Sequence, residues 1–273
     1  MNRIFLYIDI LGFENLVINH SQKVEIIFSI IDRLNVHKHF ALQTIVFSDT
    51  ILIFNKNDDY AGHYYVTYLI EYAQQLFYNL SLSNIYFKGI ITFGEFNFTR
   101  LDNIDAYYGL ALVDAHNDEK KLDGFGLFIN KNLNDDVTTF DKIDFDEKYD
   151  FVLLCQSTIN LYRDTNGVLP IEDVNMLSET DTYFRIDEDL RFFREIKYLK
   201  DNHSDKKVRE KHKKIYNLYK TTLPIFFQKF EEQGFLPFTI HSDYMGKLNP
   251  FTILAESEMN NVEHQQHQNL WQH

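Results

Sequence analysis

The chain has 273 residues, of which 45% are hydrophobic and 16% aromatic, with only four prolines and ten glycines. This composition predicts a large packed core, and the length predicts one core domain with a substantial C-terminal addition. The net charge of −13 argues against general nucleic-acid binding and against anionic membrane surfaces.

The cysteine content and the N-terminus predict where the protein works. The one cysteine, Cys155, lies in an apolar run, where we expect a core residue in a reducing compartment. The N-terminal apolar run is too short to cross a membrane and shows no cleavage site for export. We therefore expect a cytoplasmic protein.

Two apolar runs near the N-terminus each carry a lone aspartate. Residues 4–10 are nearly continuous in apolar side chains and predict a strand covered on both faces, with Asp9 inside it. Residues 11–13 then turn the chain into a helix. Residues 43–56 predict a two-stranded hairpin with Asp49 at or near its tip.

The elements that follow complete a recognisable order. Helical spacing covers 65–80, a strand covers 84–93, and a second helix and strand cover 109–122 and 125–129. The order β-α-β-β-α-β, followed by α and β, predicts an α/β (α+β) fold. It is typical of a ferredoxin-like, palm-type core in which helices pack on one face of an antiparallel sheet.

The chain divides into three predicted parts. We expect the core at 1–133, a solvated acidic linker at 134–150, and a mainly helical C-terminal extension at 151–273 that packs back on the core. Residues 185–220 hold 12 of the 27 lysines and arginines against 7 acids. A helix with a solvated basic face is the favoured interpretation, and phosphate contact or docking on the acidic core is the alternative.

The two aspartates predict a metal site. A carboxylate in an apolar strand costs several kcal/mol unless a cation or hydrogen bonds compensate for its lost hydration. In the palm topology Asp9 and Asp49 meet at one sheet edge and repel each other unless a metal holds both ionised. Either acid alone is better explained as a turn cap, but the matched pair favours Mg²⁺ or Mn²⁺, with two ions per site.

Neighbouring residues extend this site toward a nucleoside triphosphate. The backbone amides of Leu11, Gly12 and Phe13 are placed to cradle a phosphate chain, and Gly12 lets the phosphates come close. Lys88 directs a cation to the same region or is a surface lysine at a strand start. Arg100 follows that strand and could reach a phosphate across a dimer interface.

Four stretches together resemble a known family. YIDILGF, FSDTILIF, KGIITFGE and YYGLALVDAHNDEKKL follow one another as they do in class III nucleotidyl cyclases. The chain resembles most the bacterial pyrimidine cyclases of the Pycsar anti-phage system. The resemblance covers residues 3–130, and the segment at 209–223 is similar to the tail of those cyclases.

The resemblance implies roles for individual residues. Asp9 and Asp49 match the metal-binding aspartates, and the carbonyl of Ile10 matches the backbone ligand. Residues 11–13 match the turn over the triphosphate. Lys88 stands where this branch usually shows arginine, which keeps the charge but loses the fork geometry.

The substrate side of the resemblance is less complete. Thr44 and Ser48, which precede the second metal aspartate, are assigned to substrate binding. No lysine occurs at 43–46, where purine cyclases carry one. The transition-state asparagine and arginine of those cyclases fall near Val113 and Asn117, so that pair is missing.

The resemblance implies a cyclase that converts CTP or UTP to the 3′,5′-cyclic monophosphate and pyrophosphate. It also implies a homodimer with active sites at the interface, and a separate effector that reads the product during infection. Two alternatives stay open: a catalytically inactive cyclase-like domain that binds a nucleotide or protein, and a nuclease of the RNase H type. The nuclease would need a further acid near Asp9, most naturally a glutamate from a helix.

Overall fold

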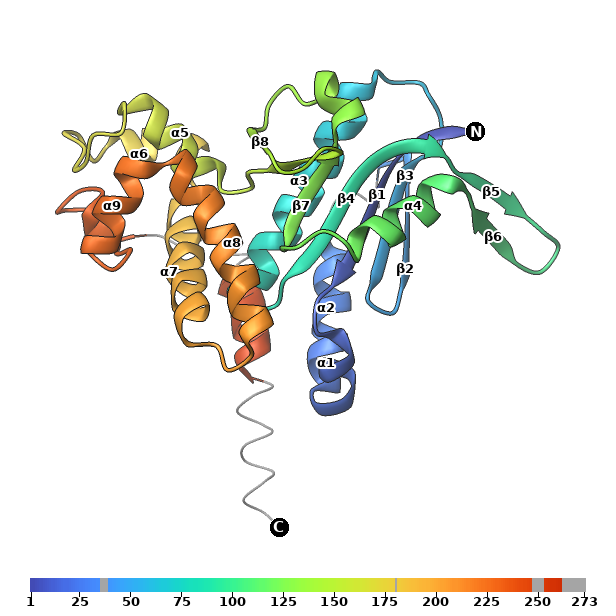
Figure 1. The fold of residues 1–273 in the computed structure, drawn as a ribbon, viewed down its shortest axis with the longest axis horizontal. Coiled ribbons are helices and arrows are strands. Elements are labelled where there is room, and N and C mark those ends of the chain that lie inside the picture. The colour runs from blue at the N-terminus through green and yellow to red at the C-terminus, as the bar shows by residue number, and fades with distance from the viewer. Residues whose placement is uncertain (35–38, 180, 247–252, 262–273) are drawn as a thin grey trace, which may run out of the picture. The chain divides into compact units, whose positions relative to one another are not determined.

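The computed structural model describes residues 1–34, 39–179, 181–246 and 253–261. The chain forms two compact units. Unit 1 comprises Met1–Phe77 and Ile85–Leu154, and unit 2 comprises Tyr78–Asn84 and Cys155–His273. Figure 1 labels the elements of both units, which are described separately below.

Unit 1 is built on a seven-stranded sheet in the order β2-β3-β1-β4-β7-β9-β8. Its first four strands, in the order β2-β3-β1-β4, are antiparallel to their neighbours, which is the arrangement of a ferredoxin-like βαββαβ unit. The predicted α/β palm-type core is therefore confirmed. The strands are β1 (Asn2–Ile10), β2 (Leu42–Phe47), β3 (Thr50–Asn55), β4 (Phe87–Glu95), β7 (Gly126–Asn130), β8 (Lys142–Asp144) and β9 (Tyr149–Val152).

Helices cover both faces of this sheet, whereas the sequence pattern predicted one. The helix α4 (Leu110–Glu119) packs on β1 and β4, in front of the sheet in Figure 1. The helix α2 (Ser21–Arg33) shares a cavity with Thr44 and Val46, which alternate with the residues facing α4. The continuous apolar run of β1 explains the difference, because a strand that is apolar on both sides must be covered on both.

Two helices and a two-stranded arm complete the outline of unit 1. The short helix α1 (Phe13–Asn19) follows β1, and the long helix α3 (Gly62–Ser81) connects β3 to β4. The strands β5 (Asn97–Arg100) and β6 (Asp105–Tyr108) form a separate two-stranded arm, which Figure 1 shows projecting from the sheet. The sequence pattern did not predict this arm.

The acidic stretch at 134–150 is part of the folded sheet. It contains the end of the 3₁₀ helix η2 (Lys131–Asp136), all of β8 and the start of β9. The Asn134 side chain donates to Asp150 over 2.9 Å, and Lys131 lies 3.7 Å from the same carboxylate. Because its buried acid is paired in this way, the stretch folds as sheet, contrary to the expected solvated linker.

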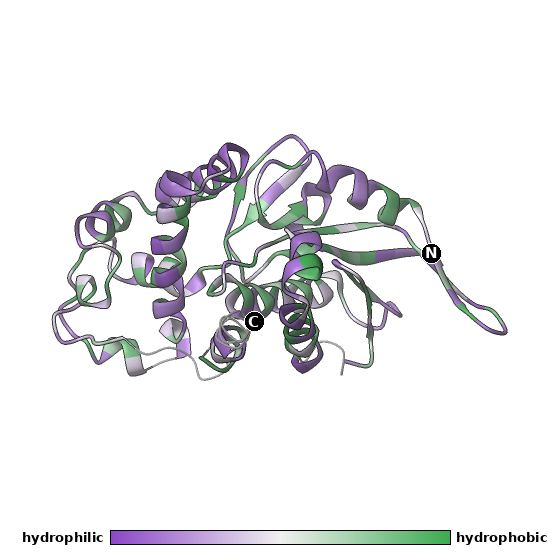
Figure 2. Cartoon of the chain, turned by 90° about the horizontal axis from the view of Figure 1, so that it is seen from below, coloured by the Kyte–Doolittle hydropathy of each residue, from purple (hydrophilic) through white to green (hydrophobic). Residues whose placement is uncertain are grey.

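Unit 2 is mainly helical, as predicted. Its helices are α5 (Gln156–Asp164), α6 (Met176–Glu179), α7 (Ile186–Asn202), α8 (Lys206–Thr222) and α9 (Pro224–Glu232). Phe193 lies at the centre of its aromatic core, with ring contacts to Tyr219, Phe227 and Phe235. Figure 2 shows hydrophobic and hydrophilic residues on the same helices, as in amphipathic helices that cover a core.

Two predictions about composition can be checked directly. Cys155 is fully buried, as expected of a core residue. In the part of the chain that the structure describes, no helix is long and apolar enough to cross a membrane.

Candidate active site

The ends of β1 and β3 bring Asp9 and Asp49 together. Asp9 lies opposite Thr50 in the β1–β3 ladder, and Asp49 directly precedes Thr50. The amide of Ile10 donates to the carbonyl oxygen of Asp49 over 3.0 Å. The adjacency of the two aspartates that the palm topology predicted is therefore present in the structure.

The turn that carries Asp49 is conformationally unusual. Phe47 pairs with Thr50, so only Ser48 and Asp49 form the hairpin loop. Ser48 has a φ of 56°, a left-handed conformation that two-residue hairpins require and that non-glycine residues adopt at a cost. The turn thus holds Asp49 at the tip, with Ser48 exposed beside it.

The environment of Asp9 disfavours its negative charge. Burial raises the pKa of Asp9 to about 6, and the nearby carboxylates of Glu119 and Asp49 add to this rise, while Lys88 opposes it. A divalent cation would relieve this repulsion, so the donor set fits Mg²⁺ or Mn²⁺. Among the described residues, no group of three or more His, Cys, Asp or Glu side chains is placed to hold a metal. The fitting ligands are therefore the two aspartates and the Ile10 carbonyl, with substrate and water completing the shell.

Lys88 lies beside the aspartates but is held by the protein. It faces Asp9 across the β1–β4 ladder and is only 4% exposed. Its Nζ lies 2.9 Å from Oε1 of Glu119 and donates to the Glu119 carbonyl oxygen over 2.7 Å. Lys88 is therefore a buried counter-ion of this acidic site, and the alternative of a surface lysine at a strand start is wrong.

Of the three backbone amides expected to bind phosphate in the turn after β1, one is already engaged. The amide of Leu11 donates to the carbonyl oxygen of Tyr86 over 2.9 Å. Gly12 has a φ of 73°, and a Cβ added there would meet nothing within 4 Å. Phe13 is buried and anchors the start of α1. The open backbone at Gly12 and Phe13 is what remains for an approaching phosphate.

Thr44 does not join the aspartates. It pairs with Ile53, which in turn pairs with Leu6. Ile45 pairs with Leu52, which pairs with Tyr7, on the face that carries Asp9. Thr44 instead lines a cavity of about 490 Å³ whose other walls belong to Phe28, Ile31, Asp32 and Val46. Strand alternation therefore places Gln43 and Ile45, instead of Thr44, on the side of Asp9.

Arg100 lies on the projecting arm. Its side chain is 79% exposed, and its Nε pairs with Oδ1 of Asp105 over 3.2 Å across the β5–β6 ladder. The structure does not bring it to Asp9 and Asp49 of its own chain.

Three residues that the sequence pattern missed lie at this site. Glu119 and His116 come from α4, and Tyr7 lies two residues before Asp9 on the same face of β1. The Tyr7 hydroxyl and the His116 Nδ1 are 3.1 Å apart. Burial raises the pKa of Tyr7 to about 12, and the charges of Asp9, Glu119 and Asp49 contribute. The period-two pattern of β1 was a usable signal for Tyr7, but nothing in the sequence paired α4 with this face.

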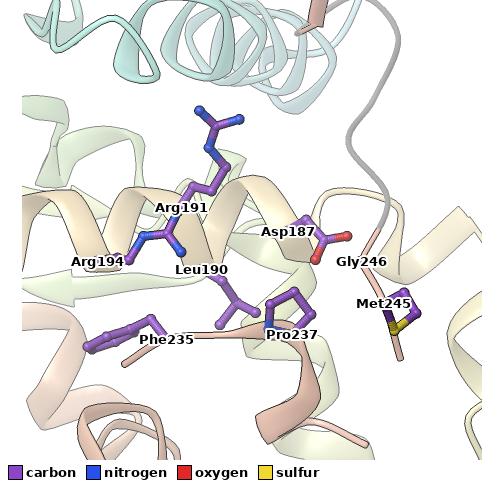
Figure 3. A pocket seen from close by; sticks show the side chains of 8 residues that line it. All are labelled: Asp187, Leu190, Arg191, Arg194, Phe235, Pro237, Met245 and Gly246. Carbon is purple, nitrogen blue, oxygen red and sulfur yellow. The ribbon is translucent and has the colours of Figure 1, made fainter. Parts of the chain in front are cut away.

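Unit 2 contains a separate cavity of about 250 Å³, shown in Figure 3. Two of its charged side chains are engaged within the unit: the Tyr244 hydroxyl donates to Asp187 over 2.7 Å, and Arg191 donates to Glu256 over 3.1 Å. It brings together no pair of carboxylates comparable with Asp9 and Asp49. Unit 1 therefore holds the better candidate for catalysis.

Among the comparisons with known proteins, the one with solved structures finds similar chains. The chain is similar to the adenylyl cyclase CyaB from P. aeruginosa, with 10% identity, 56% of this chain and 93% of that chain covered, and a TM-score of 0.43. It is similar to a bacterial light-regulated adenylyl cyclase, with 14% identity, coverage of 60% and 96%, and a TM-score of 0.42. The guanylate cyclase domain of RhGC from Catenaria anguillulae, in complex with GTP, gives 11% identity, coverage of 56% and 96%, and a TM-score of 0.41. No protein-family model and no curated protein matches the chain.

Proposed function

We propose that this chain is a metal-dependent nucleotidyl cyclase that converts CTP or UTP to the 3′,5′-cyclic monophosphate and pyrophosphate. The observation that carries the proposal is the meeting of Asp9 and Asp49 at the end of a palm-type sheet, where burial, with the repulsion of nearby carboxylates, raises the pKa of Asp9. Such a site calls for divalent cations and an anionic substrate that shares them.

In this proposal the residues of the chain hold and orient the substrate. Asp9, Asp49 and the Ile10 carbonyl would hold one or two Mg²⁺ or Mn²⁺ ions, which supply charge neutralisation of the triphosphate when bound. The backbone at Gly12 and Phe13 receives the phosphates, and Ser48 borders them from the hairpin tip. Lys88 and Glu119 form an ion pair next to Asp9, so the charge of Lys88 is shared between the two acids.

The proposed preference for a pyrimidine rests on the side chains that would face the base of the nucleotide. The side chains that share the face of Asp9 on β2 are Gln43, Ile45 and Phe47, and no lysine occurs there. Gln43 donates to the Tyr107 hydroxyl over 2.9 Å, which fixes the direction of its amide. An amide offers a donor and an acceptor, as the edges of cytosine and uracil require.

We further propose that the protein works as a cytoplasmic homodimer in anti-phage defence, where a separate effector reads the cyclic product. Large apolar side chains stand exposed on unit 1, among them Phe47 at 79%, Leu101 at 52% and Ile104 at 62%. Covering them with a second copy would remove this surface from water. Arg100, which lies on the same arm as Leu101, would then reach the active site of the partner.

The deciding experiment incubates the purified protein with Mn²⁺ and each of the four ribonucleoside triphosphates and identifies products by mass. We expect a cyclic pyrimidine monophosphate and pyrophosphate from the wild type, and none from Asp49→Ala. Asp135→Ala, an exposed acid of the same unit, serves as the matched control and should keep full activity. Absence of any cyclic product, where a known cyclase gives one, would refute the proposal.

An inactive, nucleotide-binding domain is the second candidate. The observation that favours it is the presence of Val113 and Asn117 where the resemblance places a catalytic asparagine and arginine. Calorimetry separates the two functions, because a binding domain retains the bound triphosphate through long incubation and releases no pyrophosphate.

The nuclease alternative is weakened because the third acid that it would need is already paired. Glu119 is the helix-borne glutamate near Asp9 that a nuclease would need. However, its carboxylate is engaged with Lys88 over 2.9 Å. The net charge of −13 also opposes a nucleic-acid substrate. Cleavage of RNA or DNA in the presence of Mn²⁺ would reinstate this function.

A further inference from the structure

The face of the sheet that carries Asp9 also carries a short relay of hydrogen bonds. The Thr50 side chain hydrogen-bonds to the Tyr7 hydroxyl, and that hydroxyl lies 3.1 Å from Nδ1 of His116. The Tyr7 and His116 rings meet edge to face, with centroids 6.1 Å apart. The relay thus links residues of β3, β1 and α4, and it ends at the imidazole of His116.

The direction of the relay bears on which nitrogen of a neutral His116 ring carries the proton. A tyrosine hydroxyl has one proton to donate. If Thr50 donates to the Tyr7 oxygen, the Tyr7 proton is directed to Nδ1 of His116, which then accepts. The neutral imidazole must in that case carry its own proton on Nε2. His116 is exposed, so this N–H is open to a ligand.

His116 lies beside the acidic site. Tyr7 lies on the same face as Asp9, and it interacts electrostatically with Asp9, Asp49 and Glu119. On α4, His116 precedes Glu119 by three residues, and residues at this spacing are neighbours on a helix surface. His116 also follows Val113 by three residues, so it borders one of the two positions where the resemblance places a missing catalytic side chain.

We propose that His116 is a catalytic residue of this chain's own active site, where its Nε2–H donates a hydrogen bond to a phosphate oxygen of the nucleoside triphosphate. Tyr7 is a positioning residue that holds the imidazole in the donating tautomer. This inference rests on the proposed cyclase function and names a residue that supplies what Val113 and Asn117 cannot.

The chemical step shows where such a donor acts. The 3′ oxygen of the ribose forms a bond to the α-phosphorus, and the bond from that phosphorus to the bridging oxygen breaks. The electron pair of the broken bond leaves with pyrophosphate, and the hydroxyl proton passes to water. Because negative charge grows on the leaving oxygens, a fixed N–H donor binds the transition state more strongly than the substrate.

The first experiment compares wild type, His116→Ala, His116→Asn and Tyr7→Phe in the cyclase assay with Mn²⁺. We expect His116→Ala to lower kcat by about 100-fold with little change in KM, as for loss of one oxyanion donor. His116→Asn keeps an N–H donor and should recover part of this loss. Asp114→Asn, an exposed residue of the same helix, is the control and should leave kcat unchanged.

A double variant tests the role of Tyr7. Tyr7→Phe should lower kcat less than His116→Ala, and it should have no further effect once His116 is alanine, because it acts through the imidazole. Nitrogen-15 NMR of the substrate-free protein gives a readout independent of catalysis. The His116 signals, assigned from their loss in His116→Asn, should report the Nε2–H tautomer in wild type and a mixture in Tyr7→Phe.

Mixing inactive variants tests whether His116 serves its own chain. We expect no recovery when His116→Ala and Asp49→Ala subunits are combined beyond the small activity of His116→Ala alone. Substantial recovery would overturn the assignment, since it would place His116 in the partner's site. An active wild type with an unaffected His116→Ala would also overturn it while leaving the proposed function intact. A wild type without cyclase activity would instead remove the proposed function, and this role with it.

Discussion

At the scale of single residues, the two cations Lys88 and Arg100 provide a matched comparison. Lys88 pairs with Glu119 over 2.9 Å, and their side chains are 5% and 12% exposed. Arg100 pairs with Asp105 at a similar distance, but its side chain is 79% exposed. We expect Lys88→Met to lower the free energy of unfolding by about 3 kcal/mol, because it leaves a buried carboxylate unpaired. Arg100→Met should cost less than about 1 kcal/mol.

Urea denaturation measures both costs, and a third variant identifies their origin. Adding Glu119→Gln to Lys88→Met removes the stranded charge, so the double variant should regain part of the lost stability. Equal costs for Lys88→Met and Arg100→Met would contradict the view that Lys88 acts as a buried counter-ion.

The same residues show how far the sequence could predict the site. Asp9 and Asp49 were identifiable because a lone acid in an apolar strand needs a physical explanation. Tyr7 and His116 were not, because their contact joins positions 109 residues apart and depends on how α4 crosses the sheet. Lys88 was expected near Asp9, but its pairing with Glu119 was not. Glu119 belongs to a charged run that resembles an ordinary solvated helix end.

At the scale of elements, a buried carboxylate of unit 2 joins α7 to α5 and to the last residues of α3. Asp189 on α7 accepts hydrogen bonds from the Tyr78 hydroxyl at 2.6 Å, and from the amide and hydroxyl of Thr158 at 2.9 and 3.0 Å. Burial raises the pKa of Asp189 from 3.8 to about 7 in spite of these donors. The folded protein therefore holds this proton more tightly than the unfolded chain does.

The sign of the resulting pH dependence follows from that difference. As the pH rises from 3.8 to about 7, the unfolded chain loses the Asp189 proton first, so stability from this group falls across that window. Asp189→Asn does not titrate, and its amide can keep the Thr158 bonds and donate to Tyr78. We expect the stability of wild type relative to Asp189→Asn to decrease from pH 4 to pH 7, as measured by denaturation at several pH values. Asp173→Asn, an exposed acid of unit 2, should show no such trend.

Elements also mark where prediction from the sequence ended. The long helices and the strands β1, β3 and β4 were predicted because their apolar period persists over many residues. The strand β8 has three residues and β9 has four, and both carry acids that resemble a linker. In the fold, Asp150 accepts a hydrogen bond from Asn134 and forms an ion pair with Lys131. Such pairings are not visible as a local pattern in the sequence.

At the scale of the whole chain, the order of the first four strands was predictable because a βαββαβ succession admits few un-knotted sheets. The division of the chain into two units was less predictable from the sequence. The sequence suggested a boundary near 134–150, whereas unit 1 extends to Leu154 and unit 2 also includes Tyr78–Asn84 at the end of α3. Tyr78 belongs to unit 2, where its hydroxyl donates to Asp189, a partner 111 residues away.

The arm of unit 1 supplies a test of assembly. Leu101 and Ile104 lie at its tip, 52% and 62% exposed, and their backbones are joined by a hydrogen bond of 2.8 Å that serine would preserve. If a second copy covers this tip, Leu101→Ser with Ile104→Ser should shift the protein from dimer to monomer without changing its thermal stability as a monomer. Val168→Ser, which removes an apolar side chain 63% exposed in unit 2, is the control and should leave the dimer intact. Sedimentation velocity over a range of concentrations measures the shift. An unchanged dimer in the arm variant would show that subunit contact, if it completes the active site, lies elsewhere on unit 1.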